Sequence, residues 1–265
     1  MGMVGIIMAG GLGTRLRPLT NSINKHLLPI FNKPMIFYPL TTLMLAGIRK
    51  IVVVAAPDAI PKFKDLLKDG SQLGIEINYV EEFKPAGIAQ GILLTKHIVK
   101  KEKICLILGD NIFHGIGLGR QLAQFLNPTG AQIFAYQVRD PENYGVIEIA
   151  SDGQILSLEE KPQSPKSNFA VPGIYFYDNS VIEFAGDLAP SLRGELEITD
   201  LNSVYLKLGK LNVCTLSKGT AWLDVGTFTG LLDASTYIRI IEERQNFLIG
   251  DPYQAAFTQG WVTGT

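Results

Sequence analysis

The chain has 265 residues, 46% of them hydrophobic and 18% charged, which excludes a highly charged disordered chain and predicts a buried core. Its 24 Lys and Arg residues nearly balance its 25 Asp and Glu residues, so a net charge of −1 provides no basic field for nucleic acid or an anionic membrane. The two cysteines, Cys105 and Cys214, form no Cys-x-x-Cys pair, which argues against a disulfide framework or a zinc cluster.

The N-terminal segment lacks the basic region of a signal peptide, and the apolar runs are far shorter than the roughly 18 residues of a membrane span. Together with the sparse cysteines, these features predict a cytoplasmic protein that has neither nucleic acid nor a membrane as its partner.

The first half of the chain alternates short β-branched apolar runs with longer stretches of helical spacing. Strands are predicted at 4–8, 51–56, 75–80 and 104–108, and helices at 35–46, 59–68 and 88–99. Because right-handed crossovers place such helices on both faces of a parallel sheet, this half predicts a series of β-α-β units.

The second half carries shorter, turn-punctuated pieces that are typical of added antiparallel strands. Strands are predicted at 131–138, 145–149, 155–159 and 173–177, helices at 198–208 and 228–244, and no clear period at 251–265. Since no linker or internal repeat interrupts the chain, we predict one α/β domain over residues 1–265. We expect a three-layer α/β/α, Rossmann-like architecture with a mixed and mainly parallel central sheet.

A glycine-rich loop, residues 10–13, directly follows the first predicted strand, at the edge where open parallel sheets bind ligands. Glycines let backbone N–H groups approach a phosphate, and Arg15 adds a planar fork of donors. The loop lacks the third glycine of the dinucleotide fingerprint and the Gly-Lys-Ser/Thr of a P-loop. A glycine cluster alone equally indicates a tight turn, but Arg15 and Lys25 favour a bound triphosphate.

Two acidic residues are candidate metal ligands. Asp110 follows the strand predicted at 104–108, where its carboxylate could hold Mg²⁺ on phosphates, although a lone Asp there more often caps a turn. Asp224 is a second candidate, and the sequence spacing does not establish that the two meet. Because Cys and His are rare, an oxygen-bound Mg²⁺ is the consistent choice.

A series of motifs runs through nearly the whole chain: Gly10-Gly11-Leu12-Gly13-Thr14-Arg15-Leu16, Lys25-His26-Leu27-Leu28-Pro29, Leu108-Gly109-Asp110-Asn111, Asn143-Tyr144-Gly145-Val146, Leu158-Glu159-Glu160-Lys161-Pro162, Arg193-Gly194-Glu195-Leu196-Glu197-Ile198-Thr199-Asp200 and Trp222-Leu223-Asp224-Val225-Gly226-Thr227. In this order they resemble the sugar-1-phosphate nucleotidyltransferases. Each motif alone is weak, whereas the ordered set is very specific.

The resemblance implies a Mg²⁺-dependent transfer of dTMP from dTTP to α-D-glucose 1-phosphate, giving dTDP-glucose and pyrophosphate for dTDP-rhamnose or another deoxysugar. It implies that residues 1–115 form mainly the nucleotide-binding half and residues 116–250 the sugar-phosphate-binding half. It also implies a homo-oligomer, either a tetramer or a dimer.

The resemblance further assigns roles to individual residues. The catalytic set is Arg15 and Lys25 on the β- and γ-phosphates, Lys161 on the sugar phosphate, and Asp110 and Asp224 on the metal. The nucleotide-binding set is Met8, Ala9, Gly10, Gly11, Gly13, Thr14, Arg15, Lys25, Glu82, Gly87 and Asp110. The sugar-phosphate-binding set is Asn111, Tyr144, Gly145, Glu160, Lys161, Val171 and Arg193.

The sequence departs from the family pattern in three places. Glu82 replaces a glutamine that reads the pyrimidine edge in the family. An ionised carboxylate only accepts hydrogen bonds, so the base specificity is open. UTP as the nucleotide, or another sugar 1-phosphate, is therefore an alternative substrate. His26 replaces another common glutamine, to which we give little weight. The chain ends at Thr265, before helices that help to form a regulatory nucleotide site in longer members, so we expect that site to be absent or altered.

Two other functional classes rank lower. A non-catalytic nucleotide-binding paralogue should have lost at least one charged position that the reaction needs, and all five catalytic positions are present. A dinucleotide-dependent oxidoreductase is suggested only by alternating β-α units and glycine loops, and the broken fingerprint at Arg15 and Leu16 argues against it.

Overall fold

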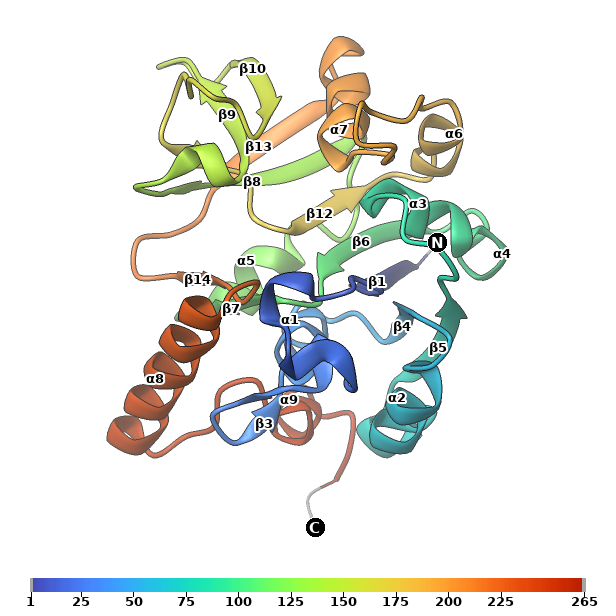
Figure 1. Cartoon of the computed structure of the whole chain (residues 1–265), viewed down its shortest axis with the longest axis vertical. Helices are drawn as coiled ribbons and strands as arrows, with labels where there is room; N and C mark the ends of the chain where they lie inside the picture. Colours follow the sequence, from blue (N-terminus) through green and yellow to red (C-terminus); the bar gives the residue numbers. More distant parts are fainter. Residues whose placement is uncertain (1, 264–265) are drawn as a thin grey trace. The chain divides into compact units, whose positions relative to one another are not determined.

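The computed structural model describes residues 2–263, which form two compact units (Figure 1). Unit 1 consists of Pro85–Leu106 and Phe125–Lys218, together with residues 2–3, and unit 2 consists of Val4–Lys84, Ile107–Gln124 and residues 219–263. The C-terminal residues therefore belong to the same unit as the glycine-rich loop. The number of domains stays a prediction.

The first part of unit 2 is a parallel three-stranded arrangement in the order β1-β4-β5. Its strands are β1 (Met3–Ala9), β4 (Lys50–Ala55) and β5 (Glu76–Glu81). Strand β4 is buried along nearly its whole length, which explains its continuous apolar run. Helices α1 (Phe37–Leu45) and α2 (Ile60–Leu67) follow β1 and β4, so the β-α-β prediction is confirmed here.

The remaining elements of unit 2 are short strands and the C-terminal helices. They are β2 (Pro29–Ile30), β3 (Lys33–Pro34), β7 (Asn111–His114), α5 (Leu118–Ala123), β14 (Ala221–Asp224), α8 (Phe228–Gln245) and α9 (Pro252–Thr258), with 3-10 turns η1 (Thr14–Leu16), η2 (Leu19–Asn21), η3 (Lys25–Leu27) and η4 (Ser71–Leu73). Helix α9 was not predicted, because seven residues are too few to reveal a period. Its start is nevertheless encoded by Asp251, whose carboxylate accepts a 2.8 Å bond from the Gln254 N–H, and by Pro252 in the first turn.

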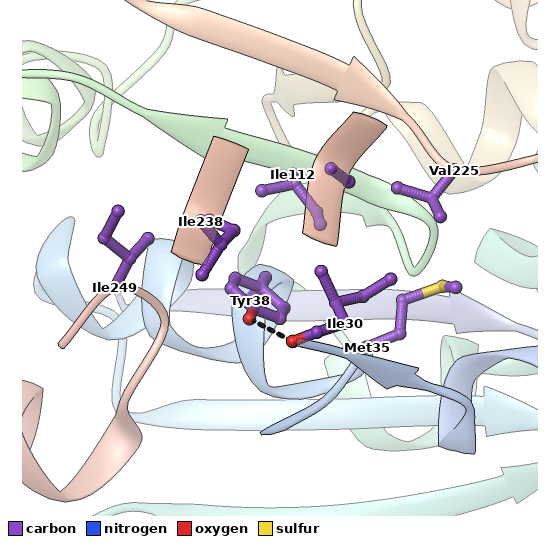
Figure 2. Close-up of a cluster of buried hydrophobic side chains, with 8 residues drawn as sticks. Ile30, Met35, Tyr38, Ile112, Val225, Ile238 and Ile249 are labelled. Carbon is purple, nitrogen blue, oxygen red and sulfur yellow. Dashed lines mark hydrogen bonds between the residues drawn. The ribbon is translucent and has the colours of Figure 1, made fainter. Parts of the chain in front are cut away.

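A hydrophobic cluster holds β7, β14 and α8 of unit 2 together (Figure 2). Ile112 on β7 and Ile238 on α8 belong to it, as does Val225 directly after β14. The Tyr38 hydroxyl, inside the same cluster, donates a 2.8 Å hydrogen bond to the Ile30 carbonyl. This packing fixes the strand ends next to Asp110 and Asp224.

Unit 1 is mostly antiparallel. Its strands follow the order β10-β9-β11-β8-β12, and β13 pairs in parallel with β8. The bounds are β8 (Ala131–Gln137), β9 (Gly145–Ile149), β10 (Ile155–Glu160), β11 (Phe169–Ala170), β12 (Ile174–Tyr177) and β13 (Leu211–Thr215), while β6 (Lys103–Leu108) begins in unit 1 and ends in unit 2. The predicted strands of the second half are confirmed.

The helices of unit 1 are α3 (Ile88–Leu94), α4 (Lys96–Val99), α6 (Val181–Gly186) and α7 (Ile198–Lys207), with a 3-10 turn η5 (Pro141–Asn143). The prediction of a single helix at 88–99 is wrong in one respect, because the structure has two helices there, α3 and α4, separated by Thr95. The Thr95 hydroxyl donates a 2.8 Å bond to the Ile92 carbonyl, and this local bond competes with a continuous helix.

The protein is therefore an α/β fold with a mixed, partly parallel sheet. The description "mainly parallel" holds for β1, β4 and β5 and not for the strands of unit 1. Within residues 2–263, no helix is long and apolar enough to cross a membrane.

Candidate active site

The glycine-rich loop leads from β1 into η1 and is tightly folded. Gly13 has a φ of 59°, in the left-handed region, and a Cβ there would lie 2.9 Å from the Thr20 side chain. The Thr20 hydroxyl donates a 2.7 Å bond to the Gly13 carbonyl. Arg15, which follows in η1, is exposed. The loop thus presents a cation at the end of a buried strand.

Lys25 and Asp110 form a largely buried ion pair in unit 2. The Lys25 ammonium donates to Asp110 Oδ2, and the two side chains are 12% and 14% exposed. Lys25 is held by Asn24, whose amide donates to the Ala9 carbonyl at 3.0 Å and accepts from the His26 N–H at 2.9 Å. Both charges therefore stand at the carboxyl end of β1.

The pair determines the protonation states around it. Burial raises the pKa of Asp110, but the charges of Lys25 and His26 and the hydrogen bonds from Lys25 and Asn111 together outweigh that effect, and the pKa falls to about 2. Burial and the Lys25 ammonium lower the pKa of His26 to about 3. At neutral pH, Asp110 is therefore a carboxylate and His26 a neutral imidazole.

Strand pairing brings Asp224 to the vicinity of Asp110, which sequence spacing could not establish. In the antiparallel β7–β14 pair, Asp224 stands opposite Asn111. The Val225 N–H donates a 2.9 Å bond to the Asp110 carbonyl. Next to them, the Trp222 indole donates a 2.7 Å bond to Asn111 Oδ1. We call Arg15, Lys25, Asp110 and Asp224 the Lys25 cluster.

This donor set fits a magnesium ion. Nowhere in residues 2–263 do three or more His, Cys, Asp or Glu side chains gather in a metal-binding arrangement. One or two carboxylates are the usual protein contribution to Mg²⁺, which keeps several waters and binds substrate phosphates. Asp110 and Asp224 are two such carboxylates at one strand end.

Glu82 lies directly after β5 and is only 3% exposed. Its backbone N–H donates a 2.8 Å bond to the Ala55 carbonyl, and its carboxyl group packs so closely on Gly10 that a Cβ there would lie 1.7 Å from Glu82 Oε2. Burial raises the pKa of Glu82. A protonated carboxyl group offers a donor and an acceptor, as the amide of glutamine does.

Six of the seven predicted sugar-phosphate residues lie in unit 1. The Thr199 hydroxyl donates a 2.5 Å bond to Glu160 Oε2, at the end of β10. Lys161 follows with a φ of 43°, which is rare for a residue with a side chain, and its N–H donates a 3.0 Å bond to the Tyr144 carbonyl. The Val171 N–H donates a 2.8 Å bond to the Gly145 carbonyl. A strained lysine thus stands beside a hydrogen-bonded carboxylate.

Arg193 joins this group through ion pairs. Its guanidinium lies 3.0 Å from Glu197 and 3.6 Å from Glu160, while the Lys161 ammonium lies 3.8 Å from Glu160. Glu197 is 8% exposed and also accepts a 2.7 Å bond from the Ser191 hydroxyl. We call Glu160, Lys161, Arg193, Glu197 and Thr199 the Lys161 cluster.

Three residues in or beside these clusters were not in the predicted sets: Trp222, Glu197 and Thr199. All three lie inside the motifs that resemble the family, so their place in those motifs could have indicated them as site residues. Gly87, predicted to bind nucleotide, has a φ of 103° and packs against Leu196, where a Cβ would lie 2.4 Å from the Leu196 carbonyl oxygen. Its nucleotide contact stays a prediction.

The predicted residues divide between the units. Unit 2 holds Met8, Ala9, Gly10, Gly11, Gly13, Thr14, Arg15, Lys25, Glu82, Asp110, Asn111 and Asp224, and unit 1 holds Gly87, Tyr144, Gly145, Glu160, Lys161, Val171 and Arg193. Asn111, assigned by resemblance to the sugar phosphate, therefore belongs to the unit of the Lys25 cluster.

Unit 2 also contains a separate cavity of about 520 Å³. It is lined by α1, by the segment joining β7 to α5, and by the segment around α9, and none of the predicted site residues lines it. His114 in its wall lies with Nδ1 2.8 Å from the Tyr237 hydroxyl, and burial lowers the His114 pKa. The expectation that a regulatory nucleotide site is absent or altered stays a prediction.

Comparisons with known proteins agree with this geometry. A family model described as "Nucleotidyl transferase" matches residues 4–240. Glucose-1-phosphate thymidylyltransferase of Mycobacterium tuberculosis (strain CDC 1551 / Oshkosh) is 52% identical over 98% of this chain and 90% of its own length. The enzyme of that name from Neisseria meningitidis (serogroup A) is 48% identical over 98% of this chain and 91% of its own length.

Solved structures give the same result. A Bacillus anthracis structure, described as a glucose-1-phosphate thymidylyltransferase in complex with a sucrose, is 38% identical with a TM-score of 0.85, covering 95% of this chain and 99% of that one. A UDP-glucose pyrophosphorylase complexed with UDP-glucose shares the fold, with a TM-score of 0.79 at 23% identity, covering 91% and 99%. The chain belongs to the nucleotidyl transferase family.

Proposed function

We propose that this protein transfers dTMP from dTTP to α-D-glucose 1-phosphate, with Mg²⁺, and so forms dTDP-glucose and pyrophosphate. The observation that carries the proposal is the Lys25–Asp110 pair beside Asp224 at the ends of β7 and β14. The identity of about half of all residues to thymidylyltransferases supports the choice of substrates. A product of this kind would supply dTDP-rhamnose or another deoxysugar.

The reaction is an in-line displacement. A phosphate oxygen of glucose 1-phosphate attacks the α-phosphorus of dTTP, a new P–O bond forms, and the bond to the β-phosphate breaks to release pyrophosphate. Such a transfer requires alignment of the two phosphates and neutralisation of their charge more than covalent help from the protein.

The Lys25 cluster serves the nucleotide. Backbone N–H groups of the glycine-rich loop and the Arg15 guanidinium bind the triphosphate, and Lys25 stabilises charge on the leaving pyrophosphate. Asp110 and Asp224 hold Mg²⁺, which when bound neutralises phosphate charge. Lys25 and Asp110 are already paired, so the cationic and anionic groups stand ready before the substrate arrives.

The Lys161 cluster serves the sugar phosphate. Lys161 and Arg193 bind the phosphate, and Glu160, held by the Thr199 hydroxyl, accepts hydrogen bonds from sugar hydroxyls. Tyr144, and the backbone around Gly145 and Val171, line the same pocket. Lys161 thereby orients the attacking oxygen.

Glu82 contacts the base. Its carboxyl oxygen accepts from the N3–H of a pyrimidine dione; only a protonated carboxyl group could also donate to O4, and burial shifts the pKa of Glu82 in that direction. The close packing of Glu82 on Gly10 supports this role, because it places the carboxyl group beside the phosphate-binding loop. Uracil presents the same edge, so UTP remains the alternative nucleotide.

Pyrophosphate release tests the function. Purified protein receives Mg²⁺, glucose 1-phosphate and one of dTTP, UTP, CTP, GTP or ATP, and each active nucleotide is then tested with galactose, glucosamine and mannose 1-phosphates. We expect a preference for dTTP and glucose 1-phosphate. A preference for UTP, or for another sugar, would replace the named substrates, and no turnover with any pair would refute the enzymatic function.

We further propose a homo-oligomer in the cytoplasm. Helices α8 and α9 expose large apolar side chains, namely Phe228, Leu232, Ile240, Tyr253 and Phe257, which a second copy could cover. Neither Cys105 nor Cys214 forms a disulfide bond, as is usual in a reducing compartment. Light scattering coupled to size-exclusion chromatography would distinguish a tetramer or dimer from a monomer.

A further inference from the structure

Gly226 is buried two residues beyond Asp224, just before α8 begins. A Cβ on Gly226 would lie 2.6 Å from Arg15 Nη2, 3.2 Å from Arg15 Cζ and 3.4 Å from Asp224 Oδ1. Its φ lies outside the left-handed region, so the backbone does not require glycine here. The Arg15 guanidinium occupies the space that a Cβ would take, so a side chain here would displace the guanidinium.

The contact joins two segments of unit 2 that are far apart in sequence. Arg15 projects from η1 after the glycine-rich loop, whereas Gly226 follows β14. Because Arg15 Nη2 and Asp224 Oδ1 both border the position of the absent Cβ, the guanidinium stands next to the segment that carries the acidic residue. A planar guanidinium can rest on a bare backbone, but a methyl group would push it away.

We propose that Gly226 is a positioning residue, whose missing side chain keeps the Arg15 guanidinium beside Asp224 before the nucleotide binds. The proposal rests on the proposed function, since Arg15 is assigned there to the triphosphate. An exposed arginine samples many rotamers, and a Cβ at position 226 would remove the rotamer that lies beside Asp224. Gly226 therefore acts on nucleotide binding through Arg15 and does not touch the substrate itself.

The first test is Gly226→Ala, with Gly186→Ala as the matched control. Gly186, in α6 of unit 1, has room for a methyl group, which would meet only Leu93 Cδ2, at 4.0 Å. For Gly226→Ala we expect KM for dTTP, and for pyrophosphate in the reverse reaction, to rise about 10-fold, while KM for glucose 1-phosphate stays within about twofold. Calorimetric titration with dTTP without metal should give a similar loss of affinity. The control should match the wild type.

A double-mutant cycle identifies the mechanism. In an Arg15→Ala background, Gly226→Ala should cause no further loss, because the group that it displaces is gone. Equal losses from Gly226→Ala with and without Arg15 would overturn the proposal, as would a Gly226→Ala variant that binds dTTP like the wild type. Absence of pyrophosphate release by the wild type would instead refute the proposed function.

Chemical rescue covers the case in which Gly226→Ala does not fold, as judged by thermal melting. Guanidinium ion at millimolar concentration, added to Arg15→Ala with Gly226 intact, should occupy the open space and restore dTTP affinity in a saturable manner. Failure of guanidinium to restore any affinity would then overturn the proposal. Methylammonium at the same concentration and ionic strength is the control, and we expect less rescue from it because it lacks the planar fork of donors.

Discussion

The two clusters differ in how their charges are held. In the Lys25 cluster, Lys25 and Asp110 are 12% and 14% exposed and are fixed by strand ends and backbone hydrogen bonds. In the Lys161 cluster, Lys161 and Arg193 are 51% and 48% exposed and are held mainly by other side chains. Water screens exposed charges far more than buried ones. The Lys25–Asp110 pair is therefore organised in advance, whereas Lys161 and Arg193 depend more on the substrate for order.

The largest expected effect concerns the organised cluster. Asp110→Asn should lower kcat by about 100- to 1,000-fold, because it removes a proposed metal ligand and leaves Lys25 without its charged partner. The measurement is pyrophosphate release over a Mg²⁺ titration, with exposed Asp65→Asn on α2 as the control. Near-normal turnover at saturating Mg²⁺ would remove Asp110 from the mechanism.

Removal of a charge from the exposed cluster should act on binding of one substrate. Lys161→Ala should raise KM for glucose 1-phosphate about 10- to 100-fold and change KM for dTTP much less. Lys166→Ala is the matched control, since Lys166 is 54% exposed and pairs with Glu159 on β10. If only dTTP affinity changed, the assignment of Lys161 to the sugar phosphate would be wrong.

A smaller effect should follow from loosening Arg193. Glu197→Gln keeps the shape of the side chain but removes the charge that holds the guanidinium at 3.0 Å, and KM for glucose 1-phosphate should rise about fivefold. Glu243→Gln, in the exposed Arg239–Glu243 pair, should have no effect. An unchanged KM in Glu197→Gln would mean that Arg193 is positioned without Glu197.

The smallest effect is one of pH on stability. Because the pKa of Glu82 is raised in the folded protein, the folded state binds more protons than the unfolded state as pH rises above about 4.5, and the free energy of unfolding falls across that window. The side chain introduced by Glu82→Gln does not titrate in this pH range. The melting temperature of the variant should therefore equal that of the wild type at pH 4, and the difference in favour of the variant should grow as the pH rises. Exposed Glu81→Gln should show no such trend. A difference independent of pH would contradict the raised pKa of Glu82.

The sequence predicted the regular elements wherever the pattern was long enough. The parallel strands and helices α1, α2, α7 and α8 were found because their apolar residues recur with the expected period. The break at Thr95 was missed because a side-chain bond to a carbonyl leaves no mark on the apolar pattern. Strands β7 and β14 were missed because each mixes apolar and polar residues over only four positions, whereas β12, of the same length, is an unbroken run of Ile, Tyr, Phe and Tyr.

The candidate site was predictable in its residue types but not in its geometry. That Asp110 and Asp224 are neighbours depends on pairing of β7 with β14, across more than one hundred residues of sequence. The raised pKa of Glu82 depends on burial against Gly10, and a sequence does not report burial of a single carboxyl group. The role of Gly226 is likewise visible only through the atoms that a side chain would meet.

The β7–β14 pair also has a consequence for how the chain is made. A ribosome that has finished β7 must translate all of Phe125–Lys218 before β14 exists, so the nascent chain carries an unpaired β7 during that time. Such distant pairing slows folding and leaves a strand edge open to aggregation. We expect pulse-labelled refolding to protect the amides of β4 and β5 before those of β7, and the two acidic residues to become neighbours only in the last step.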